Sequence, residues 1–96
     1  MSDVRNSTDV EVFVTFNKEY VVAGRTCVGV RDRLTGTWEP VLPNRVIGAV
    51  PREERDEEFV SDVVRPRVGD RLCLQVAGRR IVTTPILAVE SRARRA

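Results

Sequence analysis

The stretch from residue 69 to residue 90 constrains the fold more than any other part of the sequence. Apolar and polar or small side chains alternate from Leu72 to Val76, which is the period of a β-strand with one face in a core. A second apolar run starts at Ile81, and a turn at residues 77–80 would place Val76 opposite Ile81. In that register the second strand adds three residues to the apolar face: Thr83, Leu87 and Val89.

The N-terminal third of the sequence is also rich in strand-forming residues. Residues 9–16 alternate in the same way, with Phe13 on the face opposite to four apolar residues, Val10, Val12, Val14 and Phe16. The stretch from Tyr20 to Arg31 is dominated by Val, Thr, Tyr and Gly, and Gly24 is expected to mark a bulge or a sharp bend.

A hairpin is expected over residues 32–38. Asp32 stands at the entry of the turn, and Gly36 stands where the backbone needs a positive φ. Trp38 then begins the returning strand, opposite Val28 or Val30. The sequence favours Trp38 as an anchor of the core, and a binding role is the alternative.

The composition changes after Pro51. Acidic residues are concentrated between Glu53 and Glu58, and carboxylates after a proline favour the start of a helix. A short helix is therefore predicted within residues 52–64. The alternative is a charged loop that runs into a strand at residues 59–64.

These patterns predict a single all-β domain over residues 9–90, with or without one short helix. The expected architecture is a small antiparallel barrel of about six strands, and the alternative is a ubiquitin-like β-grasp in which an open sheet clasps the helix. Residues 1–8 are expected to form a flexible N-terminal tail and residues 91–96 a basic C-terminal tail.

The chain of 96 residues contains no histidine. The commonest general base and the commonest metal ligand are therefore missing, and the two cysteines cannot form a tetrahedral zinc site alone. No nucleophile elbow or phosphate-binding glycine loop occurs. We expect a protein that is not an enzyme and that has no metal site and no cofactor.

No apolar segment is long enough for a signal peptide or for a membrane span. The sequence therefore predicts a cytoplasmic protein without a membrane partner. In that compartment Cys27 and Cys73 are expected to remain free thiols without a catalytic role.

Several expected strands are apolar on both faces, although a chain of this size can cover only one face of a curled sheet. The second face is then expected to contact the predicted helix, another protein or a second copy of the chain. Four residues form this candidate interface: Phe13, Val21, Val82 and Ile86. The alternative is a barrel whose strands exchange faces at Gly24 and Pro85.

Arginine accounts for nearly all of the 16 basic residues and is concentrated in the C-terminal third. The candidate nucleic-acid contacts are Arg79, Arg80, Arg92, Arg94 and Arg95. No aromatic residue interleaves with them as a stacking platform. The sequence therefore favours a non-catalytic protein-interaction module, an accessory or adaptor subunit of a larger assembly. A small β-barrel that binds nucleic acid is the alternative.

Overall fold

The computed structural model describes residues 10–40, 44–56, 60 and 66–92, and within them it contains β-strands and no helix. All neighbouring strands are antiparallel in one seven-stranded sheet with the order β6-β5-β4-β3-β2-β1-β7. The all-β, antiparallel fold class is therefore confirmed. The strands are β1 (Val10–Val14), β2 (Lys18–Ala23), β3 (Thr26–Asp32), β4 (Asn44–Val50), β5 (Arg71–Val76), β6 (Arg79–Pro85) and β7 (Ala88–Arg92).

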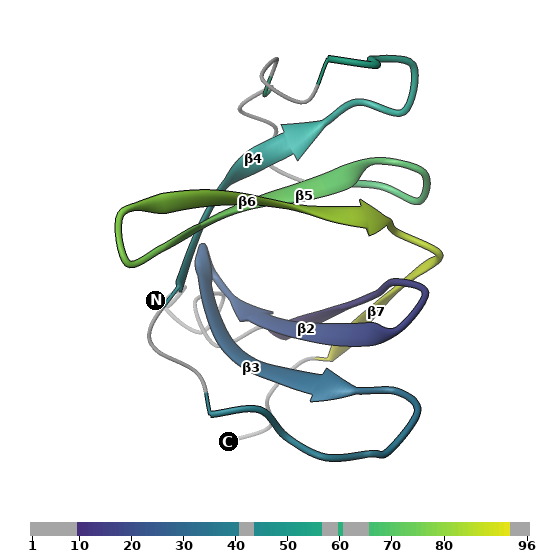
Figure 1. The fold of residues 1–96 in the computed structure, drawn as a ribbon. Helices are drawn as coiled ribbons and strands as arrows, with labels where there is room; N and C mark the ends of the chain where they lie inside the picture. Colours follow the sequence, from purple (N-terminus) through teal and green to yellow (C-terminus); the bar gives the residue numbers. More distant parts are fainter. Residues whose placement is uncertain (1–9, 41–43, 57–59, 61–65, 93–96) are drawn as a thin grey trace, which may run out of the picture.

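The two edge strands of the sheet, β6 and β7, follow each other in the chain, and the strong curl of the sheet brings them close enough for a short connection. Only Ile86 and Leu87 separate β6 from β7. The Ile86 N–H donates to the Asp70 carbonyl oxygen (2.8 Å), and the Leu87 N–H donates to the Val14 carbonyl oxygen (2.6 Å). Figure 1 shows the chain crossing here from the half of the sheet with β4, β5 and β6 to the other half. No described ladder joins β6 to β7, so the sheet is not closed into a barrel.

The core lies inside this curl. Residues from six strands and from the crossing between β6 and β7 pack together there, which explains why β-branched residues and leucines dominate the strands. The buried cluster consists of Phe13, Val22, Cys27, Val30, Val46, Leu72, Leu74 and Ile86, with Tyr20, Val76 and Val89 packed against it.

The β5–β6 hairpin confirms the predicted alternation but not the predicted register. Val76 pairs with Arg79, and Ile81 pairs with Leu74, two residues away from the expected partner. The turn is shorter than expected because Ala77 (φ 50°) and Gly78 (φ 80°) both take the left-handed backbone of a two-residue hairpin loop. A shift of two residues preserves the faces, so Ile81 still lies on the same face as Leu74.

Strand β3 pairs with two different segments along its length. Its first residues pair with β4 at Thr26 and Cys27 only. Its last residues instead contact the segment after the 32–37 turn, where Arg31 forms a bridge with Trp38 and the Glu39 N–H donates to the Val30 carbonyl oxygen (2.8 Å). This division leaves β4, β5 and β6 as one half of the sheet and β1, β2, β3 and β7 as the other (Figure 1).

The predicted helix is not found in the part of its range that the structure describes. Residues 51–56 form a turn and an irregular segment, in which the Glu54 N–H donates to the Pro51 carbonyl oxygen (3.0 Å). The rest of the predicted helix, apart from Val60, lies outside the described residues. The expected N-terminal tail at 1–8 also lies outside them. The C-terminal tail was expected at 91–96, but residues 91 and 92 belong to β7, and the rest lies outside the described residues.

Candidate functional site

The four residues of the predicted interface do not share a surface. Phe13 is 2% exposed and Ile86 is 1% exposed, and both belong to the core cluster. They cannot contact a partner in the folded protein, because the face that carries Phe13 is the one that curls inward. Val21 and Val82 are half-buried, and they lie in different halves of the sheet.

Trp38 is not the core anchor that the sequence favoured, because its side chain is 57% exposed. The indole ring lies over Gly29: a Cβ added at Gly29 would be 3.0 Å from Cζ3 of Trp38 and 3.9 Å from Cβ of Val21. The Arg31 guanidinium lies 6.0 Å from the ring centroid, at the outer limit of a cation–π contact. The absence of a side chain at Gly29 gives the ring its position on the outer face of β2 and β3.

Truncation of Trp38 should therefore cost little stability. We expect Trp38→Ala to lower the free energy of unfolding by about 1–2 kcal/mol, since only part of the indole leaves water. Gly29→Ala should instead displace the ring and change the fluorescence of the only tryptophan. Chemical denaturation and emission spectra measure the two effects. A loss of 3–5 kcal/mol in Trp38→Ala, typical of a buried tryptophan, would contradict this position.

The structure separates the predicted nucleic-acid contacts that it describes. Arg79 and Arg80 are consecutive at the start of β6, so they point to opposite faces of the sheet. Arg80 is exposed and continues a cross-strand row, in which Thr26 pairs with Arg45, Arg45 with Gln75, and Gln75 with Arg80. The backbone of Arg92 pairs with Val10 in another part of the sheet. Arg94 and Arg95 lie outside the described residues.

Both cysteines are buried free thiols, as the sequence predicted. Burial raises the pKa of the Cys27 thiol, and it also raises that of Cys73 although Arg80 acts in the opposite direction. The thiolate is the reactive form of cysteine, and burial disfavours it at both positions.

Exposed apolar side chains gather at one end of the sheet. Four loops at this end each carry one exposed apolar side chain. The exposed fractions are 77% for Phe16, 91% for Leu34, 57% for Val68 and 53% for Leu87. We call these four residues the apolar rim. The loops that carry them lie at the right of Figure 1.

Backbone hydrogen bonds hold the loops of the apolar rim side by side. The Arg33 N–H donates to the Asn17 carbonyl oxygen (2.9 Å), which joins the loop of Leu34 to that of Phe16. The Leu87 N–H donates to Val14 at the base of the Phe16 loop. The Gly69 N–H donates to the Ile86 carbonyl oxygen (2.8 Å), which joins the loop of Val68 to the β6–β7 crossing. Backbone hydrogen bonds therefore link the four loops that carry the rim.

Side-chain hydrogen bonds stabilise the turn that carries Leu34. The Asp32 carboxylate accepts hydrogen bonds from the N–H groups of Leu34 (2.9 Å) and Thr35 (3.1 Å), and the bond from Thr35 is the main reason why the pKa of Asp32 lies below its usual value. Arg33 also donates from Nη1 to the carbonyl oxygens of Thr15 (2.7 Å) and Phe16 (3.2 Å). Side-chain hydrogen bonds therefore support the Leu34 turn and tie it to the Phe16 loop.

The opposite end of the sheet has no comparable surface among the described residues. Its two hairpin turns carry small or charged residues, Gly24 and Arg25 in one and Ala77 and Gly78 in the other. Apolar residues that are exposed singly are common on protein surfaces. The concentration of four on neighbouring loops at one end is what distinguishes the rim.

The rim was not predicted, because the alternation of apolar residues placed Phe16 and Leu87 on strand faces. The available signal was their position beside turn-forming residues. Phe16 precedes Asn17, Leu87 follows Pro85 by two residues, and Leu34 lies between Asp32 and Gly36. An apolar side chain next to such residues is a candidate for presentation on a loop.

The chain matches no known family model, no curated protein and no solved structure. In the described part of the chain, no three histidine, cysteine or carboxylate side chains come together as metal ligands. No helix in that part has the length and apolar character needed to cross a membrane.

Proposed function

We propose that this protein is a non-catalytic protein-interaction module, and that it binds its partner chain through the apolar rim. The observation that carries the proposal is the rim itself: four exposed apolar side chains on hydrogen-bonded, neighbouring loops. Exposed apolar side chains that gather on neighbouring loops are candidates for an interaction site. An accessory or adaptor subunit of a larger assembly would need such a surface.

The chemistry of the described residues supports a binding role over a catalytic one. The chain has no histidine, and burial disfavours the thiolate of both cysteines. The Lys18 ammonium forms an ion pair with Glu39 (2.5 Å), and Arg31 pairs with Glu19 (3.5 Å). These charged groups, on β2, on β3 and in the segment after the 32–37 turn, form ion pairs with each other.

The proposal is tested by a double substitution, Phe16→Ser with Leu34→Ser. Both side chains are largely exposed, so the change should cost no more than about 0.5 kcal/mol of stability per site. We expect a protein that copurifies with the wild type from its native host to be retained at least about tenfold less well by the variant. Quantitative mass spectrometry of the captured material measures this, and light scattering of the purified chain detects a second copy as the partner.

Val28→Ser is the matched control, because Val28 is 57% exposed but lies within β3, outside the rim. The control should retain the partner as the wild type does. The proposal fails if the double variant also retains it, or if the wild type captures nothing and stays monomeric.

The second candidate function is nucleic-acid binding, which the row of Arg45, Gln75 and Arg80 favours. Neighbouring strands lie about 4.8 Å apart, so the two arginines of the row are roughly 10 Å apart across β5. Such a row can contact successive phosphates. This row starts at Thr26, at the beginning of β3, whereas the exposed aromatic Trp38 pairs with Arg31 near the end of β3. The aromatic ring and the arginine row are therefore apart, and this favours a protein partner over nucleic acid.

A further inference from the structure

Two surface hollows lie beside the apolar rim, on either side of the turn at residues 67–70. Both are lined by Arg52 and Val68. They differ in charge. The first contains two arginines and three carboxylates, Glu11, Glu53 and Asp70. The second contains three arginines and a single glutamate, with an apolar floor, and we call it the basic hollow.

The floor of the basic hollow is continuous with the apolar rim. Val68 and Leu87 belong to the rim and also line the hollow, together with Pro85 and Ile86. Its volume is about 670 Å³, which is enough for the side chains of a short peptide segment. The arginines at its margin are Arg52, Arg55 and Arg71.

Contacts within the protein position two of the three arginines, Arg71 and Arg52. Arg71 donates from Nη2 to the Glu54 carbonyl oxygen (3.1 Å), which fixes its guanidinium. The stem of Arg52 lies across Gly69, where an added Cβ would come within 2.8 Å of Cδ. The N–H of Arg52 donates to Oδ1 of Asp70 (3.2 Å). Gly69 thus leaves the space that the Arg52 stem occupies, with a positive φ of 99° that favours glycine.

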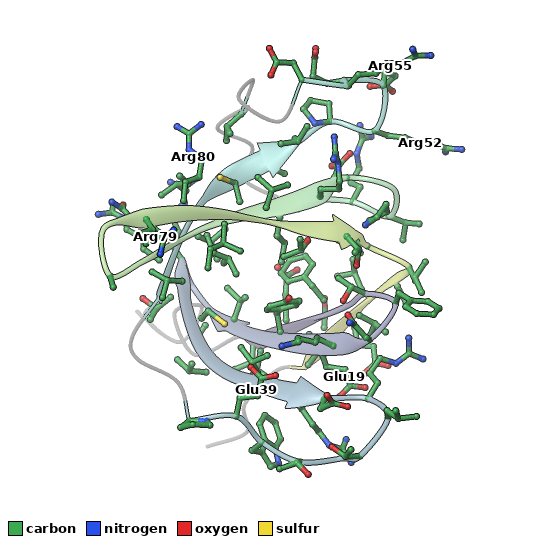
Figure 2. All side chains as sticks on the ribbon, viewed as in Figure 1. Glu19, Glu39, Arg52, Arg55, Arg79 and Arg80 are labelled. Carbon is green, nitrogen blue, oxygen red and sulfur yellow. The ribbon has the colours of Figure 1, made fainter. Side chains whose placement is uncertain are left out.

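The carboxylates closest to Arg52 and Arg55 that have printed hydrogen bonds accept them from backbone N–H groups. Glu54 accepts from the Asp56 N–H (3.2 Å) at Oε2, and both Asp70 carboxylate oxygens accept from backbone N–H groups. No described carboxylate forms an ion pair with Arg52 or Arg55. Figure 2 shows both side chains projecting from the 51–56 segment, away from the sheet.

We propose that the basic hollow binds a partner segment in which carboxylates flank an apolar side chain. The apolar side chain would lie on the floor beside Leu87, and the carboxylates would pair with Arg52 and Arg55. Planar guanidinium groups pair with carboxylates through two parallel hydrogen bonds, which gives such contacts their geometric selectivity. This inference rests on the proposed function, because it names the chemistry of the partner that the apolar rim contacts.

The test uses a short fluorescent peptide in which pairs of glutamates flank leucine and phenylalanine. A second peptide has glutamine in place of every glutamate. By fluorescence anisotropy we expect saturable binding of the first peptide to the full chain and at least about tenfold weaker binding of the second. Binding of the first should also weaken when salt is raised from about 0.05 M to about 0.5 M, because exposed ion pairs are screened.

Two variants locate the site. Arg52→Gln with Arg55→Gln should weaken binding of the acidic peptide at least about tenfold. Arg79→Gln with Arg80→Gln removes the same amount of charge from the β5–β6 hairpin, at the left of Figure 2 and away from Arg52 and Arg55 at the upper right. This variant should leave binding unchanged. Absence of binding to the wild type, or equal losses in both variants, would overturn the proposal.

Further arms separate this inference from the proposed function and from its alternative. Suppose that the Arg52 and Arg55 variant retains the native partner while the Phe16 and Leu34 variant does not. The apolar rim then binds the partner, as proposed, and the basic hollow does not contribute to binding. If the wild type binds a single-stranded oligonucleotide rather than the acidic peptide, and the Arg79 and Arg80 variant loses that binding, the partner is nucleic acid. That result would overturn both proposals.

Discussion

Phe13→Ser should remove a large share of the protein's stability. The Phe13 side chain is 2% exposed and packs in the core cluster with residues from both halves of the curled sheet. Truncation of a buried phenylalanine costs about 3–5 kcal/mol, and a serine adds a hydroxyl group without a partner in an apolar site. A domain of this size has about 5–14 kcal/mol of stability in total. Chemical denaturation followed by circular dichroism measures the loss.

Val21→Ser is the control for this prediction. Val21 pairs with Val12 on the outer face of the sheet and is half-buried, so its substitution should cost about 1 kcal/mol or less. The two variants therefore distinguish a core position from a surface position within one predicted interface. If the Phe13→Ser protein is stable and only loses its partner, Phe13 is an interface residue. That result would contradict its position in the core.

The sequence predicted the local pattern of the fold well because strand alternation depends on neighbouring residues. Leu72 and Leu74 point into the core as expected, and Gly36 has the positive φ (75°) that the 32–37 turn needs. Gly24, where a bulge or a sharp bend was expected, lies in the tight turn that closes the hairpin between β2 and β3. Each of these features is set by a few consecutive residues.

The long-range features were harder to predict because they depend on which strands become neighbours. The apolar run from Ile81 to Val89 has a strand pattern throughout, yet it divides at Ile86 and Leu87. Its second part leaves β5 and pairs with β1 at the other edge of the sheet. The residues around Pro85 signal a break, but not where the chain goes next.

The same long-range information decides the faces of a strand that is apolar on both sides. In β1 both Phe13 and Val12 are buried, and alternation alone cannot tell which of them faces the core. The pairing of Phe13 with Tyr20 and Val89, two residues packed on the core cluster, settles it. The predicted interface failed at Phe13 for this reason. The apolar rim, in contrast, depends on how four loops meet.

The second large effect is expected at Thr83, a buried polar residue at an irregular point of the sheet. The register between β5 and β6 shifts between Arg71 and Cys73, so Leu72 has no backbone partner in β6. The Thr83 hydroxyl takes that place. It accepts from the Leu72 N–H (3.0 Å) and donates to the Thr84 carbonyl oxygen (2.8 Å).

Thr83→Val keeps the volume of the side chain but removes both hydrogen bonds. It leaves the N–H of Leu72, a residue with no exposed surface, without an acceptor, which should cost about 2 kcal/mol and lower the melting temperature by roughly 10 °C. Thr83→Ser keeps the hydroxyl group and removes one methyl group, so it should cost about 1 kcal/mol. Calorimetry of both variants tests this order. If the valine variant is the more stable of the two, the Thr83 hydroxyl does not sustain the irregular pairing of β5 with β6.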